Sequence, residues 1–192
     1  MQVAFYQVIQ RISEQTGKEL SVQDITSTFQ STYFLSPSSP PRFTLKSFNL
    51  IDTVTPLSTP TPSNPSSDDE SDEPAEKRKS IIAKVTVDGV AHTIKGDGNG
   101  PLSSFLDALK TSFGIELSVR EYSEHAIDAI GKGSNTRAAS YVELLSADID
   151  PQDRSKGYWG VGIDRDITTS GLRAILSAAS SFQGKKAVEV TV

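Results

Sequence analysis

The sequence predicts an α+β fold in which a strand–strand–strand–helix unit occurs twice, after an initial pair of helices. Alternating apolar residues on both sides of Asp88-Gly89 are typical of a β-hairpin. Three strand candidates followed by one amphipathic helix occur twice, and each third strand ends in a Gly-x-Gly, at 96–98 and at 160–162. Two such units can cover each other's apolar sheet faces, so we expect a small sandwich with a site between its halves.

The composition limits the classes of protein to consider. Only 36% of the 192 residues are hydrophobic and 22% are charged, so we expect part of the chain to be unpacked. The net charge of −5 disfavours a nucleic acid or an anionic membrane as partner. The absence of cysteine excludes disulfides and thiolate chemistry. No apolar run is long enough to span a bilayer and no secretory signal is evident, so an intracellular protein is expected.

Residues 1–41 are predicted to form a helical linker subdomain. Apolar residues at helical spacing indicate a first helix over 1–16, with no capping residue before it, as in a segment of a longer chain or one started at an internal Met. Ser21 and Asp24 form a capping-box pattern for a second helix. Two short helices cannot bury their apolar faces alone, so they need either the rest of this chain or another surface.

Residues 42–192 are predicted to form the main domain. Its first unit has strand candidates at 43–50, where the alternation slips near Ser47, at 81–87 and at 90–95, and a helix that begins at Pro101. Its second unit has strands at 115–124, 138–145 and 158–163, and a helix capped by Thr168 or Thr169. Residues 186–192 are expected to add an edge strand. The Pro- and Ser-rich, then acidic, then basic stretch at 55–79 is predicted to be a disordered insertion.

The stretch 96–105 is the main candidate for a binding turn. Glycine allows positive φ and close backbone approach, and Pro101 suits the first position of a helix. Free N–H groups at such a turn can face a carboxylate or phosphate. A glycine-rich turn with a well-capped helix, without a ligand, is the other interpretation that the turn alone allows.

No catalytic constellation is evident, because His92 and His125 have no marked nucleophile or metal-ligand spacing near them. A binding site is therefore the better interpretation. The candidate turn and its apolar neighbours suit a small zwitterion with an aliphatic tail better than a nucleotide, since no Lys/Thr pair for phosphate and magnesium is present. An affinity between micromolar and millimolar, about −4 to −8 kcal/mol, is expected.

Four motifs, in this order and spacing, resemble the regulatory, or LeuA dimerisation, domain of 2-isopropylmalate synthase. They are Gly98-Asn99-Gly100-Pro101-Leu102, Tyr122-Ser123-Glu124-His125-Ala126, Ala138-Ala139-Ser140-Tyr141-Val142-Glu143 and Trp159-Gly160-Val161-Gly162-Ile163. The resemblance covers 42–181 and extends weakly upstream, where 1–19 resembles the helical linker after the family's catalytic barrel. The insertion is unlike bacterial members and indicates a fungal source.

The resemblance implies a domain that binds leucine as feedback inhibitor and helps to dimerise an enzyme that condenses acetyl-CoA with 2-oxoisovalerate. The leucine contacts that it implies are Gly98, Asn99, Gly100, Leu102, Ser103, Val119, Tyr122, Ala126, Ala138, Ile163 and Asp164. The family's catalytic barrel residues do not occur in this sequence. We therefore expect an allosteric module without catalytic residues, metal ligands or a cofactor, since the divalent metal and acetyl-CoA belong to the barrel.

The partners implied are leucine or a similar branched-chain amino acid, and a second copy of the chain or a full-length synthase, with no nucleic acid and no membrane. The compartment implied is cytoplasmic or mitochondrial. Two alternatives stay open. The chain could be a stand-alone regulatory protein that pairs with a full-length synthase, or the related isoleucine-binding domain of a citramalate synthase.

Overall fold

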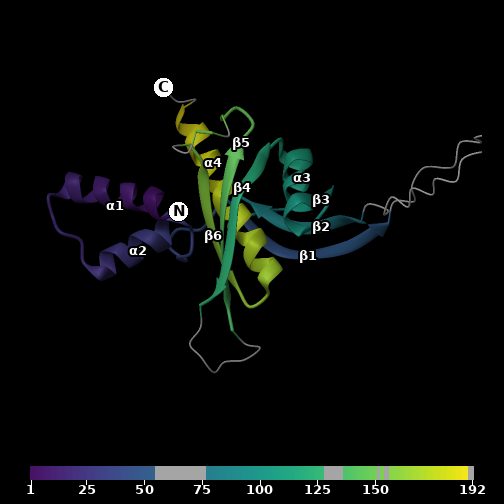
Figure 1. Cartoon of the computed structure of the whole chain (residues 1–192), viewed down its shortest axis with the longest axis horizontal. Helices are drawn as coiled ribbons and strands as arrows, with labels where there is room; N and C mark the ends of the chain where they lie inside the picture. The colour runs from purple at the N-terminus through teal and green to yellow at the C-terminus, as the bar shows by residue number, and fades with distance from the viewer. Residues whose placement is uncertain (55–76, 128–135, 151, 154–155, 190–192) are drawn as a thin grey trace, which may run out of the picture.

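In the computed structural model, two βββα units follow a pair of helices (Figure 1). The structure describes residues 1–54, 77–127, 136–150, 152–153 and 156–189. The elements of these residues are α1 (Gln2–Thr16), α2 (Val22–Thr32), β1 (Phe43–Val54), β2 (Lys77–Val87), β3 (Val90–Gly98), α3 (Pro101–Phe113), β4 (Leu117–Ala126), β5 (Ala138–Ser146), β6 (Tyr158–Asp164) and α4 (Ile167–Glu189). The predicted α+β class and its duplicated units are confirmed.

The first unit is an antiparallel sheet in the order β1-β2-β3. Asp88 and Gly89 form its hairpin turn with φ of 49° and 85°, which is the positive-φ pair that tight hairpins favour. A bulge at Lys46 interrupts the pairing of β1 with β2, as the slip in alternation near Ser47 predicted.

The predicted insertion, 55–79, extends too far at its C-terminal end. Lys77, Arg78 and Lys79 belong to β2 and pair with the last residues of β1, so the strand begins before the apolar run. The Lys79 ammonium lies 2.5 Å from the Asp52 carboxylate across this pair. Such a cross-strand charge pair supports a polar strand end that composition alone assigns to a loop. The remainder of the predicted insertion, 55–76, lies outside the described residues.

The second unit repeats this plan with a sheet in the order β4-β5-β6. Its first strand also carries a bulge, at Arg120, which is the fourth residue of β4 as Lys46 is the fourth residue of β1. The side chain of Arg120 forms a bidentate pair with Glu143 of β5, and its Nη1 donates to the Asp153 carbonyl oxygen at 2.8 Å. Glu143 is buried.

Each helix packs on the third strand of its own unit through glycine. A Cβ at Gly96 would lie 2.4 Å from the Ser104 carbonyl oxygen, and one at Gly162 would lie 2.0 Å from that of Ser170. Ser104 and Ser170 are each the fourth residue of their helix, so Gly96 is equivalent to Gly162.

The interpretation of residues 96–98 as part of a turn was therefore wrong, whereas 160–162 lie in a strand as predicted. Residues 96–98 and 160–162 lie within β3 and β6, and none of these glycines has positive φ. Close approach of a helix to the strand is what requires glycine here.

The last helix also differs from the prediction at both ends. It begins at Ile167, and the Asp166 carboxylate accepts from the Thr169 backbone N–H at 2.6 Å, so Asp166 is the cap in place of Thr168 or Thr169. Residues 186–189 continue the helix instead of forming an edge strand. Extending a helix adds one hydrogen bond per residue without a new nucleation step, whereas a strand needs a free sheet edge. Residues 190–192 lie outside the described residues.

The two units share one apolar core. Helix α3 packs on β2 and β3, and α4 packs on β5 and β6, while α4 also contacts both α3 and β1. The fully buried side chains of this core come from both units: Ile81, Val85, Ile94, Phe105, Leu109, Ile115, Val142, Leu144, Leu172 and Ile175.

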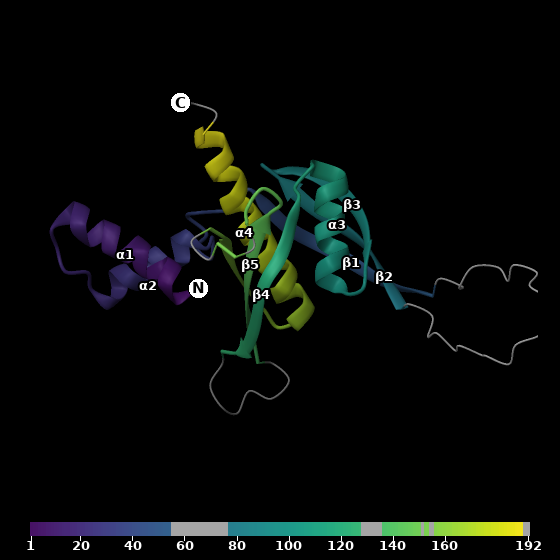
Figure 2. The same cartoon turned by 45° about the horizontal axis from the view of Figure 1, so that its top comes forward.

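The helical pair α1–α2 projects to one side of this core (Figures 1 and 2). Its capping box at Ser21 and Asp24 is confirmed. The rings of Phe5, Phe29 and Tyr33 pack together, with centroids 4.8 to 6.1 Å apart. Tyr33 is buried, and its carbonyl oxygen accepts from Ser177 Oγ of α4 at 3.0 Å.

Other apolar residues of the pair remain uncovered by the described part of the chain, such as Val3 and Val22, which are 75% and 80% exposed. None of the described helices combines the length and apolar character that crossing a membrane requires.

Candidate functional site

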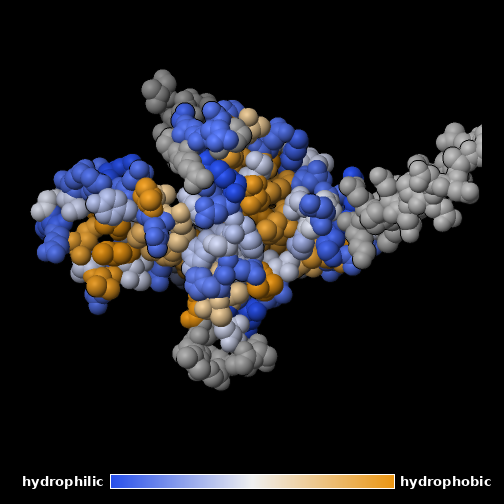
Figure 3. Space-filling view, viewed as in Figure 1, coloured by the Kyte–Doolittle hydropathy of each residue, from blue (hydrophilic) through white to orange (hydrophobic). Residues whose placement is uncertain are grey.

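A cavity of about 590 Å³ lies between the first half of α3 and the start of β4, and so between the two units. This volume is within the range of about 300–1,000 Å³ that is usual for small-molecule sites. Figure 3 shows apolar side chains exposed in the strip between these two elements. A cavity therefore lies where a binding site between the two units was expected.

The polar end of the cavity is the first turn of α3. Gly100 is the cap residue of this helix and has no side chain, and Pro101 stands at the first helical position. Among the described residues, no side chain caps the N–H groups of Leu102 and Ser103. These N–H groups and the positive end of the helix dipole can bind a carboxylate.

Hydrogen bonds hold the turn before the helix in place. The Gly100 N–H donates to Ser103 Oγ at 2.9 Å, and the Ser103 hydroxyl donates to Asn99 Oδ1 at 2.6 Å. An amide oxygen has two lone pairs, so Asn99 Oδ1 can accept a second hydrogen bond from a ligand ammonium.

The apolar part of the cavity consists of two helix residues and two strand residues: Leu102, Leu106, Leu117 and Val119. Leu106 and Leu117 were missed from the sequence, although Leu106 lies one turn after Leu102 on the same helix face and Leu117 lies on the same strand face as Val119. Lys110 and Asp107 also line the cavity. Both have partners, since the Lys110 ammonium bonds Glu116 at 2.5 Å and Asp107 accepts from the Asp97 N–H at 2.9 Å.

Five of the eleven predicted residues line this cavity: Asn99, Gly100, Leu102, Ser103 and Val119. Gly98 ends β3 beside it and is packed against Ser103 and Ser104. Tyr122 lies next to its inner wall, because a Cβ at Gly171 would lie within 3.3 Å of both the Tyr122 hydroxyl and Leu102 Cδ2. Burial, with a contribution from the hydrogen bond to Glu124, raises the pKa of the Tyr122 phenol.

The other four predicted residues lie elsewhere. Ala126, Ala138 and Asp164 are register partners in a row across the second sheet. Ala126 is seven residues after Val119, which is about 23 Å along an extended strand. Ile163 lines a smaller cavity of about 250 Å³ next to Tyr33 and Phe43. Their assignment to the ligand therefore depends on the resemblance alone.

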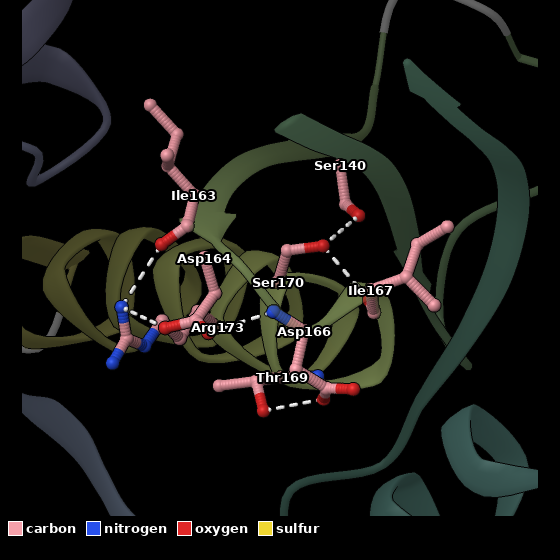
Figure 4. A network of polar contacts seen from close by, with 8 residues as sticks. All are labelled: Ser140, Ile163, Asp164, Asp166, Ile167, Thr169, Ser170 and Arg173. Atoms are coloured by element: carbon pink, nitrogen blue, oxygen red, sulfur yellow. Dashed lines mark hydrogen bonds and ion pairs between the residues drawn. The ribbon is translucent and has the colours of Figure 1, made fainter. Parts of the chain in front are cut away.

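The N-terminus of α4, which is equivalent to the candidate site, is occupied by its own side chains (Figure 4). Asp166 caps the helix, and the Asp164 carboxylate bonds the Arg173 guanidinium at 2.8 Å and the Asp166 N–H at 3.0 Å. The hydroxyls of Ser140 and Ser170 are buried and lie 2.6 Å apart. This end of the second unit therefore offers a ligand fewer open donors than the first turn of α3.

Neither histidine belongs to a catalytic arrangement within the described residues. His92 packs edge-on against Phe113, and His125 stacks on Tyr141. In the same part of the chain, no three His, Cys, Asp or Glu side chains converge as metal ligands.

Together, the paired βββα units and the interunit cavity define a small α+β domain with a candidate binding site between its two halves. Residues 70–183 match the LeuA allosteric (dimerisation) domain model, and the chain belongs to this family. It is thus a regulatory and dimerisation module.

Relatives of the chain are named 2-isopropylmalate synthase. It is 36% identical to the 2-isopropylmalate synthase of Schizosaccharomyces pombe over 94% of this chain, and 33% identical to that of Brucella suis over 96%. It is 28% identical over 95% of its length to 2-isopropylmalate synthase 2, mitochondrial, of Saccharomyces cerevisiae. The matched regions are 26%, 28% and 26% of these relatives, so the chain spans about a quarter of their length.

Proposed function

We propose that this chain is the leucine-binding allosteric and dimerisation module of a 2-isopropylmalate synthase in leucine biosynthesis. The observation that carries the proposal is the cavity between α3 and β4, in which open N–H donors lie at one end and leucine and valine side chains at the other. The names of its relatives and the family description support the same function.

The ligand would lie with its carboxylate at the Leu102 and Ser103 N–H groups, its ammonium near Asn99 Oδ1 and its side chain against Leu106, Leu117 and Val119. Burying a leucine-sized side chain contributes about 1.5–3 kcal/mol. A partly buried helix terminus adds up to about 2 kcal/mol for the carboxylate. With a few hydrogen bonds, the expected dissociation constant lies between micromolar and millimolar.

In the proposed complete enzyme, the divalent metal, acetyl-CoA and the catalytic residues belong to the barrel domain. The partners proposed are leucine and a second copy of the chain, and the compartment proposed is cytoplasmic or mitochondrial. Coupling between leucine and the distant active site would be about 1–3 kcal/mol, which is typical of allosteric proteins.

Calorimetric titration with leucine tests the ligand. The wild-type chain is expected to release or absorb heat with a midpoint below millimolar leucine. Val119→Asp, which places a charge in the apolar wall, should weaken binding at least tenfold. Val90→Asp is the matched control, because Val90 is 62% exposed in the first hairpin and away from the cavity. No heat and no thermal shift of the wild type at millimolar leucine would contradict the proposal.

Two further measurements separate the alternatives. A parallel titration with isoleucine distinguishes the citramalate synthase type of domain, which would bind isoleucine more tightly than leucine. Sedimentation of the purified chain is expected to show a dimer. A monomer that co-purifies with a full-length synthase would favour the stand-alone regulatory protein.

A further inference from the structure

Gly171 is a buried glycine in the first turns of α4, and its position is informative because the units are equivalent. It is the fifth residue of α4, and the fifth residue of α3 is Phe105, whose side chain is fully buried. Gly171 has ordinary helical φ, so alanine could adopt the same backbone. Because glycine also weakens a helix relative to alanine, what it supplies here is space.

That space lies against the ligand cavity. A Cβ at Gly171 would lie 3.1 Å from Leu102 Cδ2 and 3.3 Å from the Tyr122 hydroxyl. Leu102 is the cavity residue that follows Pro101 at the start of α3. A helix of the second unit thus limits how far a wall residue of the first unit can withdraw from the cavity.

We infer that Gly171 is a specificity-determining residue of the ligand cavity, although it does not line the cavity itself. This inference rests on the proposed function. A methyl group at 171 needs Leu102 to move away by a few tenths of an ångström, and the space on its other side is the cavity. The cavity would then favour shorter aliphatic amino acids over leucine.

The test compares leucine with valine, which has one carbon fewer, by calorimetric titration of Gly171→Ala and wild type. Burial of one methylene changes affinity about fourfold. We expect Gly171→Ala to weaken leucine binding by about that factor, to change valine binding by less, and so to lower the leucine-to-valine affinity ratio. Gly184→Ala is the matched control on the same helix, since a Cβ there has no neighbour within 4 Å. This control should leave the ratio unchanged.

A second variant keeps the test informative if the new methyl also lowers the melting temperature. The double variant Leu102→Val with Gly171→Ala shortens the side chain at 102 that the new methyl group crowds. It should restore the melting temperature and part of the leucine-to-valine affinity ratio. An unchanged ratio in Gly171→Ala, or a double variant no closer to wild type than the single one, contradicts the inference. A wild type that binds neither amino acid contradicts the proposed function itself, which is a different result.

Discussion

The two βββα units have the same frame but differ where each helix begins. Both have a bulge at the fourth residue of the first strand and a glycine, Gly96 or Gly162, beneath the helix. In the second unit, Asp166 caps the helix. In the first unit, Gly100 leaves that position open and a cavity adjoins it.

The difference shows how a duplicated fold acquires one site. Close packing of helix on strand constrains both units in the same way, so the glycines beneath the helices are shared. The chemistry of the helix terminus is not constrained by packing, so it can diverge. Three of the four predictions below test this division and one concerns the helical pair; they run from the largest expected effect to the smallest.

The largest effect should come from the shared glycines. Gly96→Val and Gly162→Val would each force a side chain into helix backbone, at 2.3 Å from the Ala108 nitrogen or 2.0 Å from the Ser170 oxygen. Each should lower the free energy of unfolding by about 3 kcal/mol or more, as measured by urea denaturation. Gly100→Ala is the control, with open space around its Cβ and an expected change within about 0.5 kcal/mol. If only one of the two valine variants lowers the free energy of unfolding, the two glycines do not have the same packing role.

The next effect concerns the residue that faces each bulge. Glu143→Gln would leave the Arg120 guanidinium, 17% exposed, without its anionic partner and should cost about 3 kcal/mol of unfolding free energy. In the wild type, the hydrogen bond to Glu143 raises the pKa of Arg120. Arginine is not deprotonated in proteins, so the guanidinium stays charged in the variant without this bond. Lys84→Gln changes the exposed, equivalent residue of the first unit and should have an effect within about 0.5 kcal/mol. If Glu143→Gln and Lys84→Gln lowered the free energy of unfolding equally, the Arg120–Glu143 pair would not distinguish the second unit from the first.

A pH dependence should follow from Tyr33, which is anchored on α4. Burial raises the pKa of Tyr33 to about 12, whereas an unfolded tyrosine titrates near 10. The unfolded state therefore loses its proton first, and the associated stability is complete below pH 10 and lost as pH rises from 10 to 12. Two pKa units correspond to about 2.7 kcal/mol.

Urea denaturation of wild type and Tyr33→Phe across this pH range measures the Tyr33 contribution. The wild type should lose more stability than the variant. Tyr6→Phe, at a tyrosine that is 63% exposed, is the control and should follow the wild type. Parallel curves for wild type and Tyr33→Phe would contradict the assignment.

The smallest effect on stability should come from exchanging the caps. Asp166→Ala should cost about 1 kcal/mol and leave leucine binding unchanged. Gly100→Asp should change stability by less than about 1 kcal/mol, because the extended backbone at Gly100, with φ of −164°, suits any residue. Its carboxylate would occupy the N–H groups proposed to bind leucine, so affinity measured by calorimetry should fall more than tenfold. Normal leucine binding by Gly100→Asp would show that the turn before α3 does not bind leucine.

The sequence predicted periodic features better than close approaches. The hairpin at Asp88-Gly89, the capping box at Ser21 and the repeated units follow from local spacing, and all are confirmed. The role of the glycines was misread because a strand glycine under a helix and a turn glycine have the same local pattern. The two cases differ only in the tertiary contact, because Ser104 lies against Gly96 and Ser170 lies against Gly162.

The site was predicted in part for the same reason. Asn99 to Ser103 follow one another in the chain, so their common location is a local property. Leu117 joins them through packing of α3 near β4, which no spacing in the sequence expresses. Ala126 and Ala138 pair across β4 and β5 as the order of strands requires, but the length of β4 separates them from the cavity.

The position of α4 has a consequence for how the domain unfolds. This helix packs on β5 and β6 and also on β1, and the Phe43 N–H at the start of β1 donates to Ser180 Oγ of α4 at 3.3 Å. Opening either sheet exposes the same helix, so we expect the two units to unfold together as one cooperative element. Backbone amides of Ile81 and of Val142 are then expected to exchange with solvent at the same global free energy.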